Sequence, residues 1–177
     1  MKTHFLNIIF LIATINIYSQ NLTIDEIISL RKKDITEAEE FLNTKKWSLL
    51  NANQPNNGKL GSMEFSFGKN EFDDKAQAFL GYYFSENSEL KRIDFDFFDK
   101  TIYNNYLTRI KSLGCKLIDS KVNDAEITKT YQGLTTTIKI TIGTRKNDFN
   151  STYTFYIFFI FSKEDYITNY NWVLIKE

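Results

Sequence analysis

The segment from Thr152 to Phe161 constrains the fold of this chain most, because almost every residue in it is apolar. If the segment is a β-strand, successive side chains alternate between its two faces. One face would carry Tyr153, Phe155, Ile157, Phe159 and Phe161, and the other would carry Tyr156, Phe158 and Ile160. Both apolar faces need cover from water, so the segment predicts a strand with something packed on each side of it.

The second apolar face has two explanations. If helices cover the face that begins at Tyr153, then loops, the tail of the chain or a curled part of the sheet can shield Tyr156, Phe158 and Ile160. Alternatively, these three side chains stay exposed and bind a partner, because large apolar surface patches usually mark interaction sites. Tyr156, Phe158 and Ile160 are therefore the candidate binding residues of an aromatic sheet face.

Other segments also have the alternating or apolar pattern of strands. They span residues 47–53, 63–67, 76–86, 90–98, 115–122, 126–131 and 134–144, and a last short strand is predicted at 171–175. Helices are predicted between them. The first begins at the capping box of Thr23 and Glu26. The second runs from about Asp34 to Thr44, and the longest, with a clear apolar stripe, follows Asp99.

A helical region followed by four strands occurs twice, in the half-repeats 20–98 and 99–177. Such repetition indicates duplicated structural units. Consecutive strands joined by short turns should pair antiparallel, with the helices covering the sheet. The sequence therefore predicts one α+β domain over residues 20–177, built from tandem helix plus four-stranded antiparallel units with the helices packed on one face of the sheet.

The start of the chain has the parts of a cleavable signal peptide, over residues 1–19. Lys2 supplies the basic tip, an apolar run extends from Phe5 to Ile17, and Ser19 is the small residue before the cut. A membrane anchor is the alternative, but a spanning helix needs about 20 apolar residues and this run is shorter. We expect an exported protein, periplasmic or extracellular, with no membrane insertion after cleavage.

Cleavage would remove His4, which is the only histidine. Without histidine, a Ser-His-Asp triad, a Cys-His dyad and a His-ligated metal site are excluded. Cys115 is the only cysteine, so we expect it to be a buried, small apolar residue, and no cofactor or metal is predicted. The loss of Lys2 leaves 21 Lys and Arg (22 − 1) against 22 Asp and Glu, which gives no general attraction to nucleic acid.

A carboxylate-based enzyme that acts on glycans is an alternative to a non-catalytic role. Such enzymes use two carboxyl groups about 5–10 Å apart across a cleft. Asp94 and Asp96 project from the same face of one predicted strand. Their alternation also fits the solvent-facing side of a strand, which needs no catalytic role.

The Tyr18-Ser19-Gln20 end of the signal, and the opening helix pair followed by Phe41-Leu42-x4-Trp47, resemble small exported proteins of Bacteroidetes-type bacteria. The repeated order of a helix plus four strands is similar in outline to the beta-lactamase inhibitor protein family, in which a concave sheet grips an enzyme. This resemblance implies a binding role of the same general kind. It rests on the order of elements, so no functional residue is carried over.

Together these patterns predict an exported, non-catalytic binding or interaction protein that uses an aromatic sheet face. Its partner would be a protein or a glycan. A self-associating envelope structural protein, which forms homo-oligomers through the same strand, is a further alternative.

Overall fold

The computed structural model describes residues 22–56, 58–69, 75–86, 88–147 and 149–170. The signal peptide predicted over residues 1–19 and the strand predicted at 171–175 lie outside these described residues. The helices are α2 (Ile24–Leu30), α3 (Ile35–Thr44), α4 (Lys100–Ser112), the short α5 (Lys163–Asp165) and the π-helical turn η1 (Tyr166–Tyr170). The strands are β1 (Trp47–Asn53), β2 (Gly61–Phe67), β3 (Ala78–Phe84), β4 (Lys91–Phe97), β5 (Lys116–Asn123), β6 (Glu126–Gln132), β7 (Thr136–Lys146) and β8 (Thr152–Ser162).

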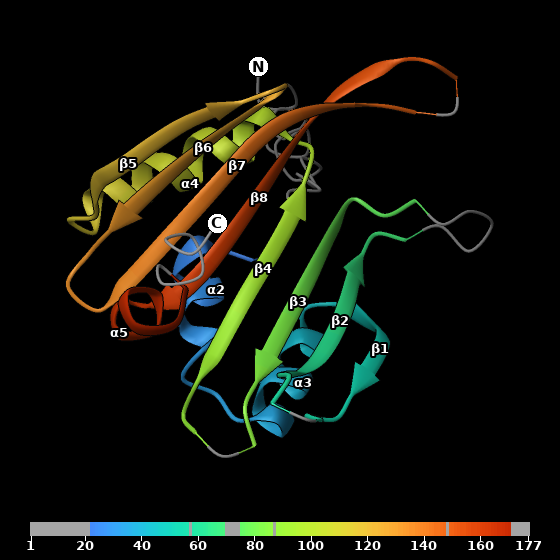
Figure 1. Ribbon diagram of the computed structural model, residues 1–177. Coiled ribbons are helices and arrows are strands. Elements are labelled where there is room, and N and C mark those ends of the chain that lie inside the picture. Colours follow the sequence, from blue (N-terminus) through green and yellow to red (C-terminus); the bar gives the residue numbers. More distant parts are fainter. Residues whose placement is uncertain (1–21, 57, 70–74, 87, 148, 171–177) are drawn as a thin grey trace, which may run out of the picture.

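The eight strands of the described residues form a single sheet in the order β1-β2-β3-β4-β8-β7-β6-β5, and each neighbouring pair is antiparallel. Figure 1 shows β4 and β8 side by side in the middle of the sheet, with β1–β3 on one side and β5–β7 on the other. Along this central joint, Ile93 lies opposite Ile160 and Phe95 lies opposite Phe158. The predicted α+β class and antiparallel strands are therefore confirmed.

The prediction of tandem four-stranded units, each with helices packed on its face, is wrong. The two half-repeats, 20–98 and 99–177, do not form two separate sheets. Strand β4 of the first pairs with β8 of the second, which makes one continuous sheet that dominates the structure. The physical reason lies in the apolar strand β8. Pairing with both β4 and β7 satisfies its backbone on two sides and buries it more completely than an edge position would.

Capping side chains fix where the helices begin. The Thr23 hydroxyl accepts a hydrogen bond from the Glu26 backbone N–H at 3.2 Å, and the Glu26 carboxylate accepts one from the Thr23 N–H at 2.7 Å. The predicted capping box of α2 is therefore confirmed. Asp34 and Glu37 form a second capping box at the start of α3, and Asp99 caps α4. Within the described residues, no helix is long and apolar enough to cross a membrane.

The buried core lies between one face of the sheet and helices α2, α3 and α4. Ile27, Leu42 and Ile110 of these helices are fully buried and belong to the same apolar cluster as Phe95 and Phe158 of the central strands. Figure 1 shows the three helices behind the sheet. Of the described residues, only α5 and η1 add helical structure near the opposite face. That opposite face, which we call the open face, is where a functional surface can form.

Candidate functional site

The candidate binding residues predicted from the sequence lie inside the core. Tyr156, Phe158 and Ile160 are 5%, 0% and 0% exposed. The ring centroid of Phe158 lies 6.2 Å from that of Tyr103 and 5.9 Å from that of Tyr106, both on α4. Helices therefore cover the face of β8 that carries Tyr156, Phe158 and Ile160, which was predicted from the sequence as a binding face. In this structure the three side chains stabilise the fold and present no surface to a partner.

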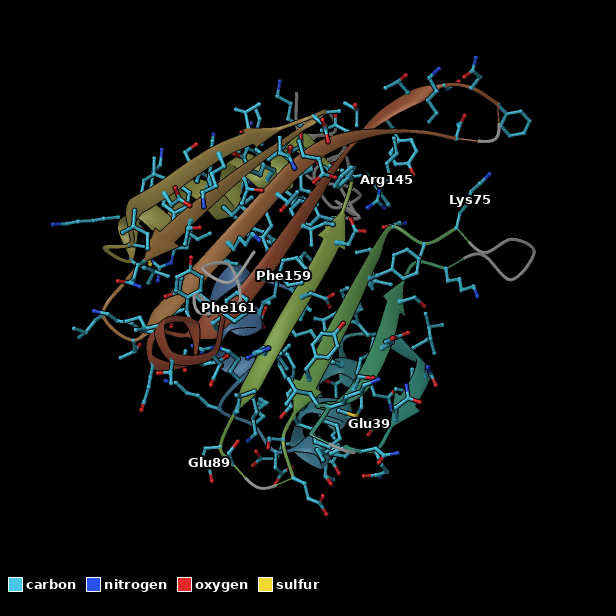
Figure 2. All side chains as sticks on the ribbon, viewed as in Figure 1. Glu39, Lys75, Glu89, Arg145, Phe159 and Phe161 are labelled. Carbon is cyan, nitrogen blue, oxygen red and sulfur yellow. The ribbon has the colours of Figure 1, made fainter. Side chains whose placement is uncertain are left out.

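The other face of β8 belongs to the open face. It carries Phe155, Ile157, Phe159 and Phe161, because side chains alternate along a strand. Figure 2 shows Phe159 and Phe161 on the side of β8 that faces the viewer, away from the helices behind the sheet. Phe159 and Ile157 are half-buried. Phe161 is covered by the C-terminal turns, with its ring centroid 5.7 Å from that of Tyr166.

Two carboxylates stand among apolar side chains on the open face. In the sheet register, Asp94 of β4 lies opposite Phe159 of β8. Asp96, the next residue of β4 on the same face, lies between Phe79 of β3 and Ile157 of β8. With a tyrosine from β3, these side chains form what we call the open-face cluster: Phe79, Tyr83, Asp94, Asp96, Ile157 and Phe159.

Asp94 lies over a glycine of the neighbouring strand. A methyl group on Gly81 would clash with an oxygen of the Asp94 carboxylate, so the carboxylate can lie close to β3 only because Gly81 has no side chain. The Tyr83 hydroxyl donates a hydrogen bond to Asp94 Oδ2 at 3.2 Å. Burial raises the pKa of Asp94, and the hydrogen bond from Tyr83 offsets only part of that rise. Burial also raises the pKa of Tyr83 to about 12, so its hydroxyl stays protonated and remains a donor.

The carboxylate of Asp96 has weaker hydrogen-bond and ion-pair contacts than that of Asp94. Arg145 reaches it only loosely, with Nη1 4.0 Å from Oδ2, because the guanidinium packs over the ring of Phe155 at 4.0 Å from its centroid. The other oxygen, Oδ1, is buried and has no hydrogen-bond partner among the described residues. Burial raises the pKa of Asp96 to about 6, although Arg145 acts in the opposite direction. The Asp96 side chain is nevertheless 24% exposed, so this carboxylate is open in part to a cation supplied from outside the domain.

Replacing Asp96 with asparagine is expected to stabilise the protein at pH 8 by about 1 kcal/mol. The folded pKa of about 6 lies above the ordinary value of 3.8, so the folded state holds this proton more tightly than the unfolded state does. Ionised Asp96 therefore destabilises the fold above pH 6, and the penalty disappears as the pH falls from 6 to 3.8. The full shift corresponds to about 3 kcal/mol, which we reduce to about 1 because the side chain is 24% exposed to screening solvent.

Thermal unfolding at two pH values measures this effect. The Asp96→Asn variant should unfold about 3 °C above the wild type at pH 8 and at the same temperature as the wild type at pH 4. An equal gain at both pH values would show that removal of the charge is not the cause.

Three pockets lined by described residues lie outside the open-face cluster. One, of about 470 Å³, is lined in part by Leu134 and Thr135 beside α5. Another, of about 310 Å³, includes Cys115, which is buried as predicted and whose thiol pKa is raised by that burial. The third, of about 290 Å³, is lined in part by Leu90 and Asp165. Asp94 and Asp96 line none of these pockets. No group of three or more metal-ligating side chains comes together within the part of the chain that the structure describes.

No protein-family model, curated protein or solved structure matches this chain. The resemblance to small exported proteins and to the beta-lactamase inhibitor protein family therefore stays an expectation from the sequence.

Sequence reasoning found the two carboxylates of the open-face cluster but missed the side chains around them. Phe159 is plain in the strand pattern, but helices were expected on its face. Tyr83 and Phe79 could be joined to the carboxylates only through the pairing of β3 with β4. The useful signal is the polarity of β4, because Asp94 and Asp96 mark the face of the sheet that helices avoid, and its partner strands share that face.

Proposed function

We propose that this chain is an exported, non-catalytic binding protein and that the open-face cluster is its binding surface. The proposal rests chiefly on Asp96, whose Oδ1 is buried without a hydrogen-bond partner among the described residues while its side chain stays 24% exposed. Buried polar atoms without partners are rare in folded proteins, so a cation that approaches the exposed part of this carboxylate would stabilise it. Export is supported by the signal-like pattern of residues 1–19.

The open-face cluster favours a protein partner that presents a lysine or arginine side chain. A cation placed beside Asp94 and Asp96 would pair with both carboxylates and lower their raised pKa values. Aromatic side chains flank the carboxylates in the sheet register, and the faces of aromatic rings also attract cations. A glycan would offer neutral hydroxyl groups, and hydrogen bonds from neutral donors to a carboxylate are weaker than those from a cation.

A titration with a five-residue peptide that has a central lysine tests this proposal. We expect up to 10 mM peptide at pH 7.5 to shift the amide NMR resonances of β3, β4 and β8, and a peptide with norleucine in place of lysine to shift none. Asp96→Asn should weaken binding about tenfold, which corresponds to about 1.4 kcal/mol for one lost ion pair. Glu40→Gln, which removes an exposed carboxylate on α3, is the matched control and should leave binding unchanged.

The pH dependence of the same titration gives a second test. Affinity should rise between pH 5 and pH 7.5, because Asp96 loses its proton near pH 6 and only its ionised form pairs with a cation. If an N-acetylglucosamine oligomer shifts these resonances and the lysine peptide does not, the partner is a glycan. If neither ligand shifts the resonances of the open-face cluster, the binding proposal is wrong.

A carboxylate-based enzyme that acts on glycans is the second candidate, because burial raises the pKa of both Asp94 and Asp96. A general acid needs such a raised pKa. Residues two positions apart on a strand are about 6.5–7 Å apart, which is comparable with the separation of glycosidase carboxyl groups. New reducing ends after incubation with chitin oligomers or peptidoglycan, lost in Asp96→Asn, would favour this candidate over a purely binding role.

A further inference from the structure

Strand β5 forms one edge of the sheet. Among the described residues, it is the last strand in the sheet order and pairs only with β6. Seven of its eight residues are exposed. Figure 1 shows β5 at the outer margin of the sheet, with α4 behind it. An edge strand of this kind presents a row of backbone N–H and C=O groups to which another strand can add.

Large apolar side chains are exposed along this edge. Val122 is 77% exposed, and Leu117 and Ile118 are each 51% exposed. Ile127 of β6, which lies opposite Val122, is 40% exposed. Covering apolar surface contributes about 25 cal/mol for each Å² removed from water. A second strand that covers these side chains would therefore be favoured.

Two charges give this edge a preferred pairing. Asp119 and Lys121 occupy regular positions after the bulge between Leu117 and Asp119. They form a 3.3 Å ion pair within the strand, yet their side chains stay 42% and 67% exposed, so both can also pair with a neighbour. The opposite edge, β1, has no Asp, Glu, Lys or Arg in its sequence, so charge cannot select a register there.

We propose that two copies of this chain associate through β5, which pairs antiparallel with β5 of the second copy about a two-fold axis at Ser120. Asp119 of each copy then lies opposite Lys121 of the other, on the regular part of the strand that follows the bulge. Opposite charges across a strand pair are stabilising. An axis at Lys121 would place lysine opposite lysine, and in-register parallel pairing would place each charge beside its like, so charge selects the axis at Ser120.

The proposed dimer surface is separate from the open-face cluster, so the two proposals can fail independently. Stable interfaces bury about 1,000 Å² or more, which a single pair of strands does not reach. Association is therefore expected to be weak and to depend on concentration.

Sedimentation equilibrium of the purified protein between 5 and 500 µM tests the dimer. We expect the average mass to rise from one chain towards two across this range. Asp119→Lys and Lys121→Asp each place like charges opposite each other, so each variant should remain a single chain at 500 µM. Glu89→Lys makes the same charge change as Asp119→Lys at an exposed position between β3 and β4, and it should associate as the wild type does.

A mixture of the Asp119→Lys and Lys121→Asp proteins separates the proposed pairing from a folding defect. One chain then has lysine at both positions and the other has aspartate at both, so the mixed pair regains two attractive contacts. We expect the mass of two chains in this mixture, and also in the double variant that exchanges both charges. A wild type that stays a single chain at every concentration, single variants that still associate, or a mixture that does not would each overturn the proposal.

Discussion

Replacing Phe158 with alanine is expected to lower the free energy of unfolding by about 4 kcal/mol. Phe158 is fully buried, and its ring centroid lies 5.4 Å from that of Phe97 and 5.9 Å from that of Tyr106. Phe97 belongs to β4 and Tyr106 to α4, so the walls of the resulting cavity are a strand and a helix that are each fixed by other contacts. The cavity can therefore close only in part. Urea unfolding followed by circular dichroism measures the loss.

Phe159→Ala is the matched control for this prediction, because it removes the same atoms one position along β8. Phe159 lies on the open face and is only half-buried, so its truncation should cost about 1 kcal/mol. Equal losses for the two variants would contradict the assignment of Phe158 to the helix-covered face and of Phe159 to the open face.

Replacing Arg92 with methionine is expected to lower the free energy of unfolding by about 2 kcal/mol, because it removes the cation that is hydrogen-bonded to a buried carboxylate. Arg92 Nε and Nη2 donate to the two oxygens of Asp165 at 2.8 and 2.9 Å, and the Asp165 side chain is 6% exposed. We expect less than the full cost of breaking a buried pair, because Asn169 still donates to Asp165 at 3.0 Å and the positive charge of Arg31 still acts on it.

The pH dependence of the Arg92 variant follows from the pKa of Asp165. Burial alone would raise this pKa, but the hydrogen bonds from Arg92 and Asn169 outweigh burial and hold it below its ordinary value of 3.8. The stabilisation by the pair is therefore present above pH 3.8 and is lost as the pH falls through the lower, folded pKa. The free energies of unfolding of the wild type and of Arg92→Met should therefore become more alike as the pH falls below 3.8.

Arg109→Met provides the comparison, because Arg109 makes the same two-bond contact with Asp25 at the surface. Both distances are 2.9 Å, but the two side chains are 51% and 46% exposed. Exposed ion pairs contribute little, so this variant should unfold almost as the wild type does. Hydrogen exchange adds a local readout, since Arg92→Met should speed exchange in residues 163–170 and Arg109→Met should not. Equal effects of the two variants would show that burial is not what makes the Asp165 pair matter.

Several elements could be predicted because their causes are local. The capping box of Thr23 and Glu26, and the alternation of Ile93, Phe95 and Phe97 on β4, act over a few residues and are visible in the sequence. The pairing of β4 with β8 could not be predicted in this way. Several strands of this chain are rich in aromatic residues, and the sequence of β4 does not indicate which of them it pairs with. The repeated order of elements favoured two units, whereas the shared burial of two apolar strands produces one sheet.

The candidate site was only half predictable for a related reason. Asp94 and Asp96 share a face because strand side chains have a period of two, so their proximity follows from the sequence. The two faces of β8 are both apolar, so the strand alone does not indicate which face the helices cover. The register settles this point, because Asp94 lies opposite Phe159 and an ionised side chain under a helix would be costly. Tyr156, Phe158 and Ile160 consequently belong to the core.

The pairing of β4 with β8 also determines when the sheet can be completed during synthesis of the chain. The ribosome releases β4 well before β8, so the strand that completes the middle of the sheet emerges last of the eight described strands. Hairpins can form early in each half, but Phe95 of β4 is not fully buried until β8 has paired with β4 and placed Phe158 opposite it. If the chain is exported as proposed, its sheet can be completed only after β8 has been released, so the core closes late in synthesis.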